Sequence, residues 1–399
     1  MSVDPHRGTT DRRRRAVIAG VATSDYPVVP DLSEHAVHGQ AADRALADAG
    51  LTLADVDGYA SAGFFPMYAA GVCEYLGLHP TYFDETNAGG ASFEVLVEHA
   101  AYAVEAGAAE VVLVTYGSVQ LSQMGRTLGT GAPSRGGGAL APGPAIHDAL
   151  WGNTLVGNYA LAARRHMHEF GTTPEQLAAV AVTMRQHAAS NPQAQKRDPI
   201  TVDDVVSSRL VADPLHKLDC CVISDGGAAC VVTTAERAAD LRKHPVHILG
   251  AAHATTHQMN LSAMPDLTVT GAAQCGPLAF ARAGITPADV DVAQLYDSFT
   301  ITVVLTVEDL GFCAKGEGGA FVADGGLGLG GRLPTNTDGG GLSACHPGMR
   351  GMFLIHEAVR QLRGEAGATQ VPGARVAVAH GTGGMLSASA TLVLGRDAP

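Results

Sequence analysis

The sequence predicts an α/β protein with two pseudo-symmetric halves, in which layers of helices cover buried strands. Two observations predict this class. Short, almost uninterrupted apolar runs alternate with stretches of helical spacing, and a strand that is apolar on both faces must be covered on both faces. A nine-residue segment, AGLTLADVD at 49–57, also returns as AGITPADVD at 283–291. A repeat at this distance indicates a duplicated half-chain rather than a short-period solenoid.

The composition limits the possible functions. A chain of 399 residues, with 46% hydrophobic residues and a mean hydropathy of +0.11, can form two domains or one large duplicated unit. The net charge of −13 argues against nucleic acid and anionic membrane surfaces as partners. No apolar stretch is long enough to span a bilayer, and the start lacks the apolar core of a signal peptide. We therefore expect a soluble, cytoplasmic protein.

The cysteines show no metal-ligand or disulfide spacing. There are seven of them, an odd number, and no C-x-x-C pair occurs. Neither a structural zinc site nor a disulfide framework is expected. We predict a chain that binds no metal of its own and works in a reducing compartment.

The first half is expected at 16–250, after a basic leader at 1–15 that lacks regular structure. The glycine at position 50 is a typical residue just after a helix end. The small residues from position 87 precede the long helix expected at 94–106. The expected elements are a strand at 16–21, a helix at 38–49, a strand from 58, a helix at 94–106 and a strand at 110–115.

An insertion at about 119–225 interrupts the first half, and the second half follows at 251–399. The insertion is rich in Gly and Pro over 125–144. Its expected helices lie at 160–170, 174–187 and 201–206, and a strand follows at 230–232. The second half is expected to hold strands at 292–296 and 375–380 and a helix at 349–363.

Two short stretches carry the residues that could do chemistry. LYDSF at 295–299 ends an apolar run with a phenol and a carboxylate, and NTDGGGLSACHPG at 336–348 leads through His346 into a helix. Small residues let backbone amides approach a ligand, and a helix start supplies unpaired N–H groups. A Tyr and a His beside such donors indicate acid–base chemistry on an oxygen. The alternative is that these stretches are only strand core and a turn.

The helix starts of the two halves are expected to face a common centre. In the first half this start is NAGGASF at 87–93, and in the second half it is the turn at His346. We therefore expect Gly90 to lie near His346, with Tyr296 beside them.

The chain resembles the thiolase superfamily over nearly its whole length, most closely the sterol-carrier-protein-type branch. NAGGASF at 87–93 corresponds to the thiolase pattern N-x-x-C-A-S-G, and YDSF at 296–299 to N-E-A-F or H-D-C-F. CHP at 345–347 corresponds to G-H-P, and HGTGG at 380–384 to the late C-x-G segment. The resemblance implies the thiolase fold, layered α-β-α-β-α. It also implies that Gly90 occupies the position of the thiolase nucleophile, a cysteine.

The missing sulfur separates two mechanisms. Cleavage of a 3-ketoacyl thioester needs a nucleophile that carries the acyl group, and the nearest thiols, Cys345 and Cys73, have no evident base. Retro-aldol cleavage of a 3-hydroxyacyl thioester needs only a base for the hydroxyl proton and donors for the enolate oxygen. The absence of a Cys side chain also leaves room for a bulky substituent.

The resemblance assigns expected roles to the site residues. Tyr296 is expected to be the base or a proton relay, with Asp297 or His346 taking the proton onward. His346 and the backbone N–H of Gly90 are expected to bind the enolate oxygen. Gly381 and Gly383 are expected to complete the oxyanion and substrate-binding backbone.

Within the superfamily, the pattern is similar to lipid-transfer-protein-type steroid side-chain aldolases. This implies cleavage of a 17-hydroxysteroid side-chain CoA ester to a ketone and propionyl-CoA, with the coenzyme A thioester as substrate and no tightly bound cofactor. It also implies a homodimer with an OB-fold, zinc-ribbon acyl-CoA-binding partner, and hence a heterotetramer. The best-known members carry a second Tyr in the glycine-rich C-terminal motif, where this chain has His346.

Two other functions stay open from the sequence. The first is a thiolase-type acyltransferase, similar to an acetyl-CoA acetyltransferase, that uses another nucleophile. The second is a non-catalytic acyl-CoA-binding subunit. The latter would be favoured if Tyr296 and His346 pointed into the core, away from any site.

Overall fold

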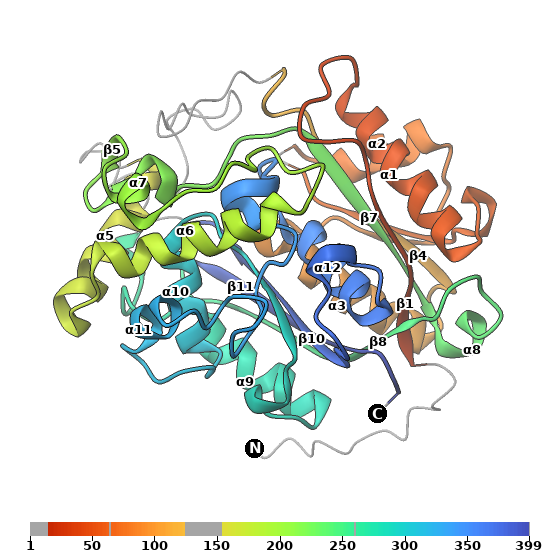
Figure 1. Cartoon of the computed structure of the whole chain (residues 1–399). Coiled ribbons are helices and arrows are strands. Elements are labelled where there is room, and N and C mark those ends of the chain that lie inside the picture. The colour runs from red at the N-terminus through yellow and green to blue at the C-terminus, as the bar shows by residue number, and fades with distance from the viewer. Residues whose placement is uncertain (1–14, 64, 124–153, 259–260, 399) are drawn as a thin grey trace.

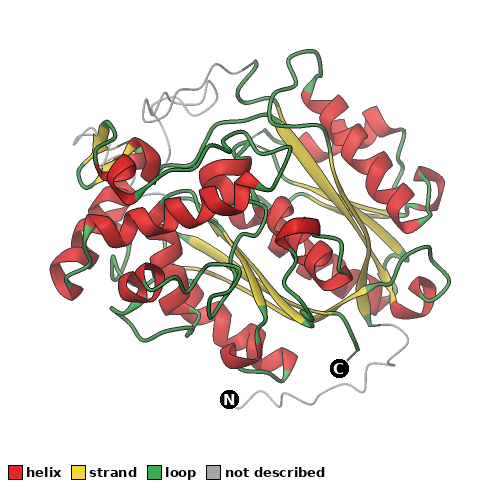
Figure 2. Ribbon diagram, in the orientation of Figure 1, coloured by secondary structure: helices red, strands yellow, loops and turns green. Residues whose placement is uncertain are grey.

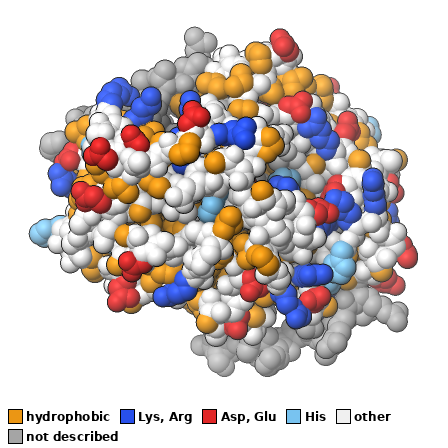
Figure 3. Space-filling model, in the orientation of Figure 1, with side chains coloured by type: hydrophobic (Ala, Val, Ile, Leu, Met, Phe, Trp, Pro, Cys, Tyr) orange, Lys and Arg blue, Asp and Glu red, His pale blue; other side chains and the backbone are white. Residues whose placement is uncertain are grey.

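The computed structural model describes residues 15–63, 65–123, 154–258 and 261–398 (Figure 1). The expected leader at 1–15, apart from its last residue, and the Gly/Pro-rich segment at 125–144 lie outside these ranges. No helix of the described residues is long and apolar enough to cross a membrane. On the face seen in Figure 3, acidic and basic side chains are interspersed, so the net negative charge is not gathered there into one patch.

Nine strands of the described residues form one mixed sheet in the order β3-β2-β4-β7-β1-β8-β11-β10-β9. The two halves of the chain join through a short antiparallel pairing of β1 with β8. The strands are β1 Ala16–Thr23, β2 Gly58–Ser61, β3 Tyr82–Asp84, β4 Val111–Ser118, β7 Gly226–Thr234, β8 Val246–Thr255, β9 Val292–Leu295, β10 Val376–Gly383 and β11 Ala388–Gly395, with a separate hairpin of β5 Leu210–Ala212 and β6 Leu215–His216.

The helices cover both faces of these strands. They are α1 Glu34–Ala49, α2 Tyr68–Leu76, α3 Ser92–Ala106, α5 Leu155–Phe170, α6 Pro174–Ala189, α7 Val202–Val206, α8 Ala235–Ala238, α9 Ala272–Ala283, α10 Thr300–Asp309, α11 Gly318–Ala323 and α12 Gly351–Arg363. The helices expected at 38–49, 94–106 and 174–187 are therefore present with slightly different ends. The helix expected from 160 begins earlier, at Leu155, because the Thr154 hydroxyl caps its first turn.

The layers follow the predicted order of helix, strand, helix, strand and helix (Figure 2). Helices α3 and α12 form the central layer, where their apolar side chains pack with inward-facing residues of β4, β7, β10 and β11. Helices α1 and α2 cover the outer face of the first-half strands. Helices α9 and α10 cover the outer face of the second-half strands, and α5 and α6 of the insertion pack there too. The fold class predicted from the sequence is confirmed.

The repeated nine-residue segment performs the same structural task in each half. Gly50 and Gly284 end α1 and α9 in the left-handed conformation, with φ of 79° and 71°. A 3-10 turn with a capping box follows in both copies. The carboxylates of Asp57 and Asp291 then accept hydrogen bonds from the backbone N–H groups at the starts of β4 and β10. This shared arrangement explains why the segment is nearly identical in the two halves.

Candidate active site

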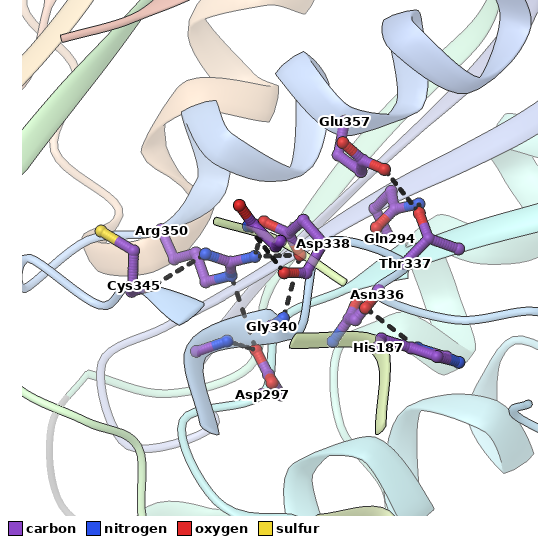
Figure 4. A network of polar contacts seen from close by, with 12 residues as sticks. His187, Gln294, Asp297, Asn336, Thr337, Asp338, Gly340, Cys345, Arg350 and Glu357 are labelled. Atoms are coloured by element: carbon purple, nitrogen blue, oxygen red, sulfur yellow. Dashed lines mark hydrogen bonds and ion pairs between the residues drawn. The ribbon is translucent and has the colours of Figure 1, made fainter. Parts of the chain in front are cut away.

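A buried arginine, Arg350, organises the glycine-rich turn at 336–348 (Figure 4). Its side chain is fully buried, and Nη2 donates to both carboxylate oxygens of Asp338 at 2.7 and 2.6 Å. Its Nη1 donates to the carbonyl of Cys345 at 2.7 Å. Charge-assisted hydrogen bonds of this kind fix geometry as well as contributing energy. Arg350 therefore joins the early part of the turn to the residue immediately before His346.

The carboxylate of Asp297 is also held by this turn. Its two oxygens accept hydrogen bonds from the N–H groups of Gly341 at 2.7 Å and Leu342 at 3.1 Å, and Arg350 Nε lies 3.7 Å away. Glycine is required at 340, since its φ is 65° and a Cβ would lie 2.1 Å from the Asp297 carboxylate. Burial raises the pKa of Asp297 to about 6, against the effect of Arg350. The structure places this carboxylate on the backbone of the turn.

Tyr296 and His346 meet edge to face beside this turn. Their ring centroids are 5.5 Å apart and their planes cross at 83°. The Tyr296 side chain is 4% exposed, and its hydroxyl donates to the carbonyl of Gly348 at 3.4 Å, a long contact. The Nε2 atom of His346 is buried and has no hydrogen-bond partner among the described residues. Buried polar atoms normally have partners, so this nitrogen is available to a bound ligand.

Burial shifts the pKa values of these two rings in opposite directions and in both cases favours the neutral form. It raises the pKa of Tyr296 well above the ordinary value, with smaller contributions from Cys221 and Tyr159. Burial, followed by the positive charge of Arg350, lowers the pKa of His346 to about 4. At neutral pH the phenol is therefore protonated and can donate, and the imidazole is neutral and can accept a proton.

Gly90 lies directly against the Tyr296 ring. Residues Gly89–Ala91 form a 3-10 turn that leads into α3, and the Ser92 hydroxyl tightens it by accepting from Ala88 N–H at 2.9 Å. A Cβ at position 90 would lie 2.4 Å from two ring carbons of Tyr296 and 2.3 Å from a backbone carbonyl. Any side chain at position 90 and the phenol would thus compete for one space. The expectation that the missing Cys side chain leaves room for a bulky substituent is therefore wrong, because the Tyr296 ring occupies that room. The proximity of Gly90 and Tyr296 expected from the sequence is present.

The glycine-rich end of β10 closes the site from another side. A Cβ on Gly383 would lie 1.7 Å from the carbonyl of Ala88 and 3.1 Å from the nitrogen of Gly90. Gly381 lies equally close to α3, since a Cβ there would be 2.2 Å from a carboxylate oxygen of Glu94. Glycines at these positions allow β10 to touch the turn at Gly90. Gly90, Gly381, Gly383, Tyr296 and His346 thus lie in one region formed by both halves.

Comparison with known families shows which family the chain belongs to. The thiolase N-terminal domain model matches residues 21–236, and the thiolase C-terminal domain-like model matches residues 252–396. The chain belongs to the thiolase superfamily.

Three curated relatives and one solved structure are similar to this thiolase-superfamily protein. It is 38% identical to "Steroid side-chain-cleaving aldolase" of Thermomonospora curvata, covering 96% of this chain and 98% of that protein. It is 37% identical to "17-hydroxy-3-oxo-4-pregnene-20-carboxyl-CoA lyase" of Mycobacterium tuberculosis, covering 92% and 97%. It is 35% identical to "Acetyl-CoA acetyltransferase" of Methanothermobacter thermautotrophicus, covering 96% and 100%. The solved "Ltp2-ChsH2(DUF35) aldolase" superposes with a TM-score of 0.84 at 35% identity, covering 96% and 98%.

None of the seven thiols, all of which lie in the described ranges, is activated as a nucleophile, because burial raises the pKa of each. Cys345 is fully buried, its sulfur lies 3.1 Å from the Ser224 hydroxyl, and burial raises its pKa to about 12. Burial raises the pKa of Cys73 to about 11, and its side chain packs in the outer core of the first half. Nucleophilic cysteines require the opposite, a lowered pKa. In the part of the chain that the structure describes, no group of three or more His, Cys, Asp and Glu residues could hold a metal.

Glu94 is a site residue that the sequence analysis did not identify. It lies on α3, four residues after Gly90, and is fully buried. Neither of its carboxylate oxygens has a hydrogen-bond partner among the described residues. Its neighbours are the glycines 351 and 381. A Cβ added at these positions would lie 2.5 and 2.2 Å, respectively, from one of its oxygens. Burial raises the pKa of Glu94 to about 8, so the carboxyl is mostly protonated at neutral pH.

Replacing Glu94 by Gln is expected to reduce the loss of stability that occurs as the pH rises from about 4.5 to 8. The folded-state pKa lies above the unfolded one, so the native state binds more protons between about pH 4.5 and 8 and loses stability as pH rises. Glu94→Gln removes this dependence, and a pKa difference of one between the folded and unfolded states corresponds to roughly 1.4 kcal/mol. Urea unfolding at pH 5, 6.5 and 8 measures it. Equal slopes of stability against pH in both proteins would contradict a neutral Glu94.

Replacing Gly90 by Ala is expected to abolish most of the activity, because the new methyl group would displace the Tyr296 ring or the β10 backbone. Overpacking typically costs about 1–3 kcal/mol of stability, and a shift of about 1 Å in a catalytic group can cost roughly 100-fold in rate. Gly330→Ala is the matched control, since a Cβ there meets nothing within 4 Å. Equal activity in the two variants would show that the contact at Gly90 is unimportant.

Proposed function

We propose that this thiolase-superfamily protein catalyses the retro-aldol cleavage of a 3-hydroxyacyl-CoA thioester, specifically a 17-hydroxysteroid side-chain CoA ester. The products are a 17-ketosteroid and propionyl-CoA. One observation carries the proposal: Gly90, which by the resemblance corresponds to the thiolase nucleophile, has no side chain, and the Tyr296 ring fills the space that one would need. Acyl transfer through a cysteine at that position is therefore impossible in this chain.

The cleavage balances without any further reactant. The hydroxyl proton leaves, the bond between the hydroxylated carbon and the carbon next to the thioester breaks, and the oxygen becomes a ketone. The electron pair of that bond forms a thioester enolate, which then takes a proton on carbon to give the short acyl-CoA. The protein must supply a proton acceptor near the hydroxyl and donors for the enolate oxygen.

The geometry favours His346 as the proton acceptor and Tyr296 as a donor. His346 is neutral and its Nε2 has no partner within the described structure, whereas burial keeps the Tyr296 phenol protonated because it raises the pKa of that group. The Tyr296 hydroxyl and the backbone N–H of Gly90 are suited to hold the enolate oxygen. Asp297 then acts as a positioning residue, because it fixes the turn that carries His346. The sequence alone leaves open whether Tyr296 or His346 is the base.

The relatives support the substrate class. The names of two proteins with 38% and 37% identity refer to cleavage of a steroid side chain and to a lyase acting on a 17-hydroxylated carboxyl-CoA. Coenzyme A then enters and leaves as part of the thioester, and no tightly bound cofactor takes part.

The same comparisons support a partner subunit of the DUF35 type, because the similar solved structure is an aldolase that contains one. We expect this subunit to have an OB fold and a zinc ribbon and to bind acyl-CoA. A homodimer is supported by exposed apolar side chains on and beside edge strand β3, namely Phe83 on the strand and Phe65 and Met67 in the segment that bonds to Glu85 just after it. All seven cysteines are free, which suits the reducing cytoplasm.

A thiolase-type acyltransferase remains the second candidate because of the 35% identity to an acetyl-CoA acetyltransferase. Assays with matched 3-hydroxyacyl-CoA and 3-ketoacyl-CoA substrates, with and without free CoA, distinguish the two. The aldolase releases ketone and propionyl-CoA from the 3-hydroxy substrate without free CoA. Cleavage of only the 3-keto substrate, and only when CoA is added, would support the acyltransferase. Each assay is run with and without the DUF35-type subunit, to show whether that subunit completes the site.

A further inference from the structure

A second buried phenol, Tyr159, reaches the site from the insertion. It lies on α5, is 3% exposed, and its ring packs on Phe299 with centroids 4.4 Å apart. Its hydroxyl donates to the carbonyl of Gly384 at 3.3 Å. This distance is long for an O–H···O hydrogen bond, whose usual length is about 2.7–2.8 Å. The oxygen also accepts hydrogen bonds from the Ser298 side chain and the Leu386 backbone. Its own proton has only the long contact with Gly384 and can therefore turn to a better acceptor.

The surroundings of Tyr159 place it at the edge of the proposed active site. Gly384 borders the turn that carries Gly90, since a Cβ on Gly89 would lie 2.7 Å from the Gly384 nitrogen. Tyr159 is also close enough to Tyr296 to contribute, after burial, to the raised pKa of that residue. Burial raises the pKa of Tyr159 itself to about 12, so its phenol stays protonated and can donate.

We propose that the Tyr159 hydroxyl binds the hydroxyl oxygen of the substrate, the oxygen that becomes the ketone. This inference rests on the proposed aldolase function. A 3-hydroxyacyl thioester presents one oxygen on each side of the bond that breaks: the hydroxyl oxygen and the thioester oxygen. In this arrangement Tyr296 and Gly90 hold the thioester oxygen. Tyr159, whose hydroxyl reaches the Gly384 carbonyl beside the Gly90 turn, holds the other oxygen, and His346 takes the hydroxyl proton.

A purely structural role makes different predictions. If Tyr159 only anchors α5 to the Gly384 carbonyl, loss of its oxygen would lower stability and affect all ligands alike. If it binds the substrate oxygen, the loss would depend on whether the ligand carries the hydroxyl group. Tyr159→Phe keeps the ring that packs on Phe299 and removes only the oxygen, so the two roles can be separated.

The kinetic test compares Tyr159→Phe with Tyr59→Phe, using the full chain with its partner subunit. Tyr59 is a matched control, because it is buried in the first half and its hydroxyl bonds to Thr115 Oγ1 at 2.7 Å. We expect Tyr159→Phe to lower kcat by roughly 100-fold, as for loss of one donor to a developing charge. The melting temperature should stay within the range of the control. A kcat equal to that of Tyr59→Phe would overturn the proposal.

The binding test uses the Tyr296→Phe background, in which turnover is suppressed. Equilibrium binding of the 17-hydroxy acyl-CoA and its 17-deoxy analogue is measured before and after adding Tyr159→Phe. We expect about a tenfold loss of affinity for the hydroxylated ligand only, the worth of one hydrogen bond. Equal losses for both ligands would overturn the proposal. Wild-type protein without aldolase activity would instead refute the proposed function, so the two failures are distinguishable.

Discussion

Replacing Tyr296 by Phe is expected to lower turnover by about 10²–10³-fold, the usual cost of removing one hydrogen-bond donor to a developing oxyanion. The phenol lies edge to face with His346 and against Gly90, so its oxygen can reach the reacting part of the substrate. The ring is retained in the variant and continues to fill the space beside Gly90. Acyl-CoA binding should therefore change little. Steady-state kinetics and binding of an unreactive acyl-CoA measure the two effects separately.

The control for this variant is Tyr59→Phe, which also removes one buried phenolic oxygen but lies outside the site. It is expected to keep turnover close to the wild-type value. Turnover in Tyr296→Phe that equals this control would exclude Tyr296 from the chemistry. Loss of acyl-CoA binding together with turnover would mean that the phenol contributes mainly to substrate binding.

Replacing Arg350 by Met is expected to destabilise the protein by about 3–5 kcal/mol, the usual cost of leaving a buried partner charge uncompensated. Asp338 and Asp297 would both lose their cation inside the protein, and the carbonyl of Cys345 would lose its donor. The turn that carries His346 should become disordered before the rest of the chain unfolds. Activity is then lost at temperatures where the secondary structure persists. Thermal unfolding followed by circular dichroism, with activity measured in parallel, tests this.

Arg44→Met is the matched control for the arginine. Arg44 also pairs with a carboxylate, that of Asp25 at 2.9 Å, but the two side chains are 43% and 57% exposed. Exposed ion pairs contribute only about 0–1 kcal/mol. A loss of stability in Arg350→Met that is no larger than in Arg44→Met would show that the buried cluster does not hold the turn.

Much of the fold could be predicted from the sequence because the signals are local. The helix ends at Gly50 and Gly284 depend on one residue with a positive φ, and apolar runs mark strands covered on both faces. The position of Tyr296 beside both Gly90 and His346 also agrees with the expectation that pseudo-symmetric halves bring two helix starts to one centre. These predictions needed only spacing, glycine positions and the repeat.

The remaining site residues depend on contacts between segments far apart in the chain. Glu94, whose carboxyl has no hydrogen-bond partner in the described ranges, looks like any polar residue of a helix until glycines 351 and 381 are seen around it. Arg350 follows the His-Pro pair closely, yet nothing in the sequence shows that it is fully buried between two carboxylates. Tyr159 lies in an insertion whose helices carry no motif, and only packing brings it to Gly384.

Cleavage without an acyl-enzyme is tested most directly by mass spectrometry of a reaction run in D2O without free CoA. The 17-hydroxy acyl-CoA is incubated with the protein and its DUF35-type partner, and the masses of both products and of the intact protein are measured. We expect ketone and propionyl-CoA in equal amounts, one solvent deuterium on the carbon next to the thioester, and an unchanged protein mass. A protein that gains the mass of an acyl group, and forms product only after free CoA is added, would contradict the proposed retro-aldol chemistry.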